Sequence, residues 1–126
     1  MNDTHVLIVE RDEATTQKIC AMLLSNNRSL SIEQTNHGKK ALAMASKKPP
    51  QLIVVAIQLE GEWDGVQTIV QIQQKLGTHI PVIYLSTHRD PTTWERAKRT
   101  HPHNFFLKPL KEKEVEIALE MALFAV

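Results

Sequence analysis

The chain has 126 residues, a length that fits one domain with one hydrophobic core and leaves no room for a second, so residues 1–126 are expected to fold together. Hydrophobic residues make up 42% and charged residues 23%, which excludes the disordered, collagenous and disulfide-rich classes. Lys and Arg total 15 against 14 Asp and Glu, and this net charge of +1 gives no reason to expect nucleic acid or a membrane as a partner.

Five short apolar runs predict the strands of one sheet. The runs at 5–9, 52–57 and 80–85 are continuous and rich in β-branched residues, which is typical of parallel strands covered by helices on both faces. Weaker runs at 30–34 and 104–107 complete the set of five.

A helical pattern follows each run. The fifth helix begins near Lys111, where a cation replaces the usual hydrogen-bond acceptor. Strand and helix alternate five times, which predicts an α/β fold: a doubly wound, five-stranded parallel sheet with its binding crevice at the carboxyl ends of the strands. The expected capping residues of the other helices are Asp12, Asn36, Asp64 and Asp90, the last followed by Pro91 at a favoured first position.

Several side chains of chemical interest stand where the predicted strands end. The four glycines form neither a G-x-G-x-x-G fingerprint nor a phosphate-binding loop, which excludes those nucleotide-binding sheets. The strand-end residues are Glu10, Arg11 and Asp12 after the first run, Ala56 in the third, Ser86 and Thr87 after the fourth, and Lys108 after the fifth.

Three segments carry a resemblance to a known family. AIQLEGEWDGV at 56–66, IPVIYLS at 80–86 and NFFLKP at 104–109 resemble the third, fourth and fifth strands of the receiver domains of two-component response regulators, over about residues 5–123. The resemblance implies the CheY-like (βα)5 fold, a three-layer sandwich of flavodoxin-like type. In that family an Asp that ends the third strand accepts a phosphoryl group. Acidic residues after the first strand hold Mg²⁺, and a Lys and a Ser or Thr bind the phosphoryl oxygens.

The chain departs from that pattern at two positions. Ala56 stands where the resemblance expects the phosphoacceptor, and a methyl group can neither attack phosphorus nor ligate a metal. Arg11 stands where it expects the main metal-binding Asp, so a permanent cation replaces a ligand. Glu10, Ser86 and Lys108 fit their family roles, whereas Thr87 is larger than the usual residue. We expect no cofactor, with Mg²⁺ binding lost or very weak.

The altered pocket also predicts a new charge pairing. Without an Asp at position 56, the Lys108 ammonium needs another carboxylate, and Glu10 is the expected partner. Arg11 then supplies a fixed positive charge that holds the domain in one state.

The expected function is a degenerate receiver domain in two-component signal transduction that works by protein–protein interaction, without phosphorylation and without enzyme activity. Its expected partner is a protein such as a sensor histidine kinase or an output protein. The alternative is a phosphate-accepting receiver of a phosphorelay whose acceptor Asp at position 56 has been replaced by Ala.

The resemblance places the output surface on the fourth helix, fifth strand and fifth helix. Phe105 matches the family's aromatic switch position, or is simply a packed ring at the sheet edge. Ile117, Met121 and Phe124 lie opposite the apolar stripe of the last helix, which indicates a homodimer or partner contact, or scattered exposed residues at a fraying end. Trp94 either joins this surface or fills a core position.

The remaining signals are weaker. The single Cys20 and the absence of a signal-peptide pattern at the start indicate a cytoplasmic protein, and the longest apolar run is far below the roughly 18 residues of a membrane span. His101 and His103 supply at most part of a zinc site, so no metal site is expected.

Overall fold

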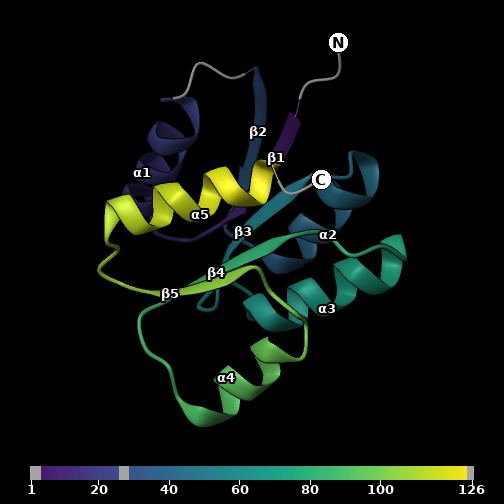
Figure 1. The fold of residues 1–126 in the computed structure, drawn as a ribbon. Coiled ribbons are helices and arrows are strands. Elements are labelled where there is room, and N and C mark those ends of the chain that lie inside the picture. Colours follow the sequence, from purple (N-terminus) through teal and green to yellow (C-terminus); the bar gives the residue numbers. More distant parts are fainter. Residues whose placement is uncertain (1–3, 26–28, 125–126) are drawn as a thin grey trace.

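The computed structural model describes residues 4–25 and 29–124, except for the side chain of Phe124 (Figure 1). In these ranges strands and helices alternate as predicted. In chain order they are β1 (Thr4–Val9), α1 (Glu13–Leu24), β2 (Leu30–Thr35), α2 (Gly38–Lys47), β3 (Leu52–Ala56), α3 (Gly65–Leu76), β4 (Val82–Ser86), α4 (Pro91–Lys98), β5 (Asn104–Leu107) and α5 (Glu112–Phe124).

The five strands form one parallel sheet in the order β2-β1-β3-β4-β5. Every residue of β3 and β4 is buried, which explains why these two runs are apolar without alternation. The predicted doubly wound α/β fold is confirmed. No helix in the described ranges is long and apolar enough to cross a membrane.

Helices cover both faces of the sheet. Side chains of α1 and α5, among them Ile19 and Leu119, pack on one face, and side chains of α2, α3 and α4, among them Ala41 and Ile69, pack on the other (Figure 1). Since the two layers leave the carboxyl ends of the strands uncovered, the polar residues that follow the strands meet at one edge of the molecule.

The predicted helix caps hold at two of four positions. Asp64 accepts a hydrogen bond from the Gln67 N–H at 2.8 Å, and Asp90 accepts one from the Thr93 N–H at 3.0 Å. Asp12 occupies the cap position of α1, but its carboxylate accepts from the Thr15 hydroxyl instead of a backbone N–H.

The prediction of Asn36 as the cap of α2 is wrong, because α2 begins at Gly38 and His37 is the capping residue. The Asn36 carbonyl accepts a hydrogen bond from the Glu60 N–H at 3.0 Å, and His37 bridges Glu60 in the manner of a short strand. This tertiary pairing keeps Asn36 outside the helix and moves the start of α2 one residue along the chain.

The edge strand β2 is joined to β1 by a buried histidine. His5 is 2% exposed, and its Nε2 lies 2.9 Å from Oε1 of Glu33 on β2. Its Nδ1 lies 3.1 Å from the Ser31 carbonyl oxygen. The imidazole thus adds side-chain contacts to the backbone pairing of a strand that is only half-buried.

Tyr84, the only tyrosine of the chain, yields a test of the buried core. Its hydroxyl lies 2.8 Å from the Thr100 hydroxyl, which itself donates to the Ala97 carbonyl, so Tyr84 is the donor in this pair. Burial raises the pKa of Tyr84 from its ordinary 10.0 to about 12.

We expect the native protein to show a tyrosinate absorbance midpoint at about pH 12, and the urea-unfolded chain to show it near pH 10. Between these values the unfolded chain has released a proton that the folded chain retains, so the free energy of unfolding falls as the pH rises through this window. A native midpoint near 10 contradicts the buried, hydrogen-bonded phenol.

Candidate functional site

The sequence-predicted site residues Glu10, Ala56, Ser86 and Lys108 come together at the carboxyl edge of the sheet. Ala56 is paired in register with Leu85 on β4, next to Ser86, and the Lys108 N–H donates to the Ser86 carbonyl at 2.7 Å. The parallel pairing of four neighbouring strands therefore brings residues nearly one hundred positions apart to one place.

The centre of the site is an ion pair between Lys108 and Glu10, as the charge argument predicted. The Lys108 Nζ lies 2.8 Å from Glu10 Oε1, and the two side chains are 18% and 1% exposed. This contact is a charge pairing without hydrogen-bond geometry, since Oε1 accepts no directed hydrogen bond within the described residues. Glu10 Oε2 accepts from the Asp12 N–H at 3.1 Å.

Ala56 ends β3 and is buried, with 1% of its surface exposed. Its carbonyl is pressed against Gly65, where an added Cβ would stand 2.1 Å from the Ala56 oxygen. Only glycine fits at this point, which gives the D-G turn at 64–65 a steric reason. The Ala56 methyl itself offers the site no polar group.

Arg11 points away from the buried pair. Its guanidinium lies 3.9 Å from a Glu60 carboxylate oxygen, and both side chains are more than half exposed, so this ion pair contributes little stability. Arg11 also lines a surface hollow of about 360 Å³ together with Gln58 and His88.

Asp12 is exposed and contacts Thr15 of its own helix. The Thr15 hydroxyl that donates to its carboxylate lowers the pKa of Asp12. The three residues of the predicted acidic pocket therefore face three different partners.

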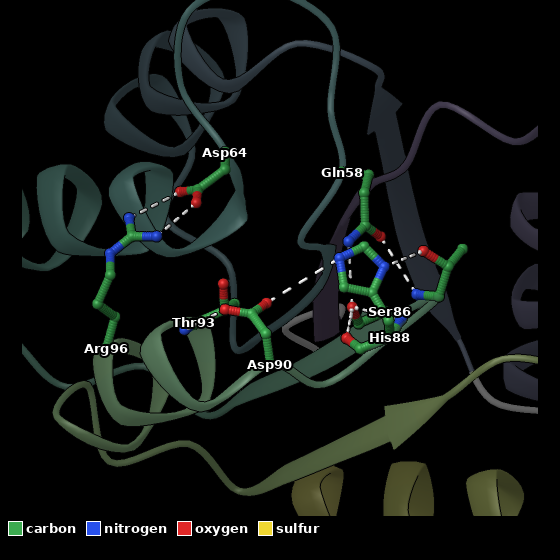
Figure 2. A network of polar contacts seen from close by, with 8 residues as sticks. Gln58, Asp64, Ser86, His88, Asp90, Thr93 and Arg96 are labelled. Atoms are coloured by element: carbon green, nitrogen blue, oxygen red, sulfur yellow. Dashed lines mark hydrogen bonds and ion pairs between the residues drawn. The ribbon is translucent and has the colours of Figure 1, made fainter.

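A hydrogen-bonded bridge joins the loop after β3 to the loop after β4 (Figure 2). Gln58 Nε2 donates to the Ser86 hydroxyl at 3.2 Å, and the Thr87 N–H donates to Gln58 Oε1 at 3.2 Å. The Ser86 hydroxyl in turn donates to the His88 carbonyl at 2.5 Å.

Gln58 and His88 were missed by the sequence analysis. The only signal for Gln58 was its place two residues after Ala56, the spacing that puts side chains on one side of an extended chain.

A second bridge ties α4 to the start of α3. Arg96 donates from both terminal nitrogens to the Asp64 carboxylate, at 2.7 and 3.1 Å, a bidentate geometry that fixes the relative orientation of the two groups (Figure 2). Burial works to raise the pKa of Asp64, but the hydrogen bonds from Arg96 and from the Gln67 N–H outweigh it, and the pKa is lowered.

The predicted output residues lie on both sides of β5. Phe105 packs edge-to-face on Trp94, with ring centroids 5.1 Å apart, and Arg89 and Lys98 approach the Trp94 ring from outside. Ile117 and Met121 are on α5, which covers the other face of the sheet, and are 60% and 59% exposed. The side chain of Phe124 lies outside the described residues.

The described residues contain no group of three His, Cys, Asp or Glu side chains that could hold a metal ion.

The comparisons with known proteins point in one direction. The model of the response regulator receiver domain family matches residues 6–120. The chain is 28% identical over 123 residues to a Rickettsia felis protein named as an NtrX-like response regulator, a match that covers 97% of this chain and 25% of that protein. The chain thus spans about a quarter of the length of the curated relatives it matches.

Two solved structures share the architecture over nearly their whole length. The signal receiver domain of a modulated diguanylate cyclase from Desulfovibrio desulfuricans G20 superposes with a TM-score of 0.83 at 27% identity, covering 98% of this chain and 96% of that one. The N-terminal domain of a response regulator/sensory box/GGDEF protein from Carboxydothermus hydrogenoformans has a TM-score of 0.79 at 30% identity, covering 95% and 94%.

The buried ion pair can be tested by removing one charge at a time. Lys108→Met keeps much of the side-chain stem but leaves Glu10 buried without its counter-charge, and we expect the free energy of unfolding to fall by about 3 kcal/mol in urea titrations at neutral pH. Adding Glu10→Gln should restore most of the loss. Lys111→Met, at an exposed lysine nearby, is the matched control. Equal stability of the Lys108 and Lys111 variants contradicts the pair.

Proposed function

The chain belongs to the response regulator receiver domain family, and from that premise we propose that it is a signalling module that works without phosphorylation, without bound Mg²⁺ and without enzyme activity. It acts by contact with another protein. The observation that carries this proposal is Ala56 at the end of β3, in the place where the family resemblance expects the phosphoacceptor.

Three carboxylates of the described loops at this edge of the sheet already have partners. Glu10 is buried against Lys108, and Asp64 is held by both nitrogens of Arg96. Asp12 accepts from Thr15 on the exposed side of the site. To take the place of the missing acceptor, Glu10 or Asp64 would first have to break its ion pair.

The donor set also does not fit Mg²⁺. This ion demands several oxygen ligands in near-octahedral geometry, and carboxylates usually supply the protein's share. Among the described residues Glu10 is the one acidic side chain that is buried, and its Oε1 lies 2.8 Å from the Lys108 ammonium. Arg11 adds a second cation on the rim.

The proposed interaction surface is the face made by α4, β5 and α5. Its apolar side chains Leu107, Ile117 and Met121 are between 48% and 60% exposed. These exposed side chains are in addition to the apolar stripe with which α5 covers the sheet. A protein partner fits this face and the near-neutral net charge better than nucleic acid or a membrane does. A sensor histidine kinase, an output protein or a second copy of the chain are the candidates.

One alternative draws support from Ser86 and Lys108, which occupy the positions that a phosphate-accepting receiver needs. In that alternative the chain is a phosphorelay receiver whose acceptor Asp has been replaced by Ala.

The two functions are separated by amide NMR titrations of the protein and of Ala56→Asp with Mg²⁺ and beryllofluoride, a mimic of an aspartyl phosphate. We expect neither protein to show shifts around Glu10, Ser86 and Lys108, because Arg11 and the Lys108–Glu10 pair oppose the metal in both. Ala56→Asp/Arg11→Asp is the comparison that removes the rim cation. Strong shifts in Ala56→Asp alone overturn the proposal in favour of the phosphorelay alternative.

The interaction surface is tested by sedimentation over a range of protein concentrations. Ile117→Lys and Met121→Lys replace exposed residues, so each should change the free energy of unfolding by no more than about 0.5 kcal/mol. A dimer that both variants abolish assigns the face to a second copy, and a monomer at all concentrations excludes a second copy as the partner. A dimer that survives both substitutions contradicts the choice of this face.

A further inference from the structure

We propose that the Gln58 carboxamide is a built-in substitute for a bound ligand: it bridges the loops after β3 and β4 and thereby holds the start of α4 in one arrangement. This inference rests on the proposed function, because it explains how a receiver domain without phosphoryl chemistry keeps its output face in a single state. It assigns a positioning role to Gln58.

The bridge uses both ends of one side chain. The amide nitrogen of Gln58 donates to the Ser86 hydroxyl and its oxygen accepts from the N–H of Thr87, each at 3.2 Å. Two bonds from one planar group to consecutive residues fix the distance between the loops and also their relative orientation. Figure 2 shows the carboxamide directed at the end of β4.

The bridge leaves the Ser86 hydroxyl fully occupied. A hydroxyl has one proton to donate and two lone pairs that accept. The proton of Ser86 goes to the His88 carbonyl at 2.5 Å, and its oxygen accepts from Gln58 Nε2 and, at 3.3 Å, from the His88 N–H. One donated and two accepted bonds complete the set without water, and Ser86 is fully buried. A phosphoryl oxygen can only accept, so it could bind the Ser86 hydroxyl only after the hydrogen bond from Ser86 to the His88 carbonyl had broken.

The constraint passes from Ser86 to α4 through the loop at 87–90. The Thr87 hydroxyl lies 3.1 Å from His88 Nδ1, and His88 Nε2 lies 4.0 Å from the Asp90 carboxylate. Asp90 caps α4 through the Thr93 N–H, and that hydrogen bond lowers the pKa of Asp90. The loop therefore leads from the Gln58 bridge to the first turn of the helix, with a 4.0 Å approach between the exposed His88 and Asp90 side chains and a direct hydrogen bond at the cap.

The contacts close into a ring. Arg96 in α4 donates two hydrogen bonds to Asp64, the last residue of the β3–α3 loop, which also carries Gln58. The helix is thus tied to the β3–α3 loop at two points, through its capping loop and through its last turn (Figure 2). The Trp94–Phe105 pair, which belongs to the proposed interaction surface, sits on this fixed helix.

The test is Gln58→Met, which keeps the length and volume of the side chain but removes its donor and acceptor. We expect the amide of Thr87, which loses its hydrogen-bond acceptor, to exchange with solvent about tenfold faster than in the unmodified protein, with a shift or broadening of the Trp94 indole resonance. Gln74→Met, at an exposed glutamine of α3, is the matched control and should change neither signal. Unchanged exchange and an unchanged Trp94 resonance in Gln58→Met overturn the inference.

A double-mutant cycle provides a second, independent readout. If Gln58 acts through Ser86, the stability losses of Gln58→Met and Ser86→Ala are not additive, and the double variant loses less than their sum. Additive losses contradict the bridge.

The outcomes also separate this inference from the proposed function. A loosened loop in Gln58→Met together with beryllofluoride binding by Ala56→Asp retains the bridge and rejects the proposed function. An unchanged loop together with an inert Ala56→Asp rejects the bridge alone.

Discussion

The buried ion pair between Lys108 and Glu10 is the interaction on which the site depends. It links the residue after β1 to the residue after β5 and so spans the ends of β3 and β4, which lie between them in the sheet. Neither charge is acceptable without the other: an unpaired buried ion is strongly destabilising, whereas a matched pair is close to neutral. With a methyl at position 56, Glu10 is the carboxylate left for Lys108, and the pair joins the ends of β1 and β5.

A second set of contacts at the same edge of the sheet is made of neutral hydrogen bonds and one bidentate ion pair. Gln58 joins two loops, and Arg96 joins α4 to Asp64. The Lys108–Glu10 pair engages the charges that a metal or phosphoryl group would use. The Gln58 bridge engages the hydroxyl of Ser86. Under the proposed function, these internal contacts fix the position of α4 without phosphorylation and without a bound ligand.

The sheet was predictable because β3 and β4 are buried on both faces and therefore read as continuous apolar runs. The Lys108–Glu10 pair was predictable from charge balance once the strand ends were aligned. The start of α2 was not, because the pairing of Asn36 with Glu60 depends on contacts distant in sequence. The roles of Gln58 and His5 could not be predicted for the same reason. A loop glutamine belongs to no periodic pattern, and the role of a strand histidine is visible only when Ser31 and Glu33 lie beside it.

The features that oppose phosphoryl chemistry come from different strand ends, and this bears on how the site arose. Ala56 ends β3, Arg11 follows β1, and the occupied Ser86 hydroxyl ends β4. A single replacement of Asp by Ala at position 56 accounts for the first of these but for neither of the others. Arg11 departs from the family pattern independently of position 56, and one of the hydrogen bonds that Ser86 accepts comes from Gln58. The proposed phosphorylation-independent function explains all three together, because each favours a pocket that is closed by its own side chains and needs no ligand to fix its shape.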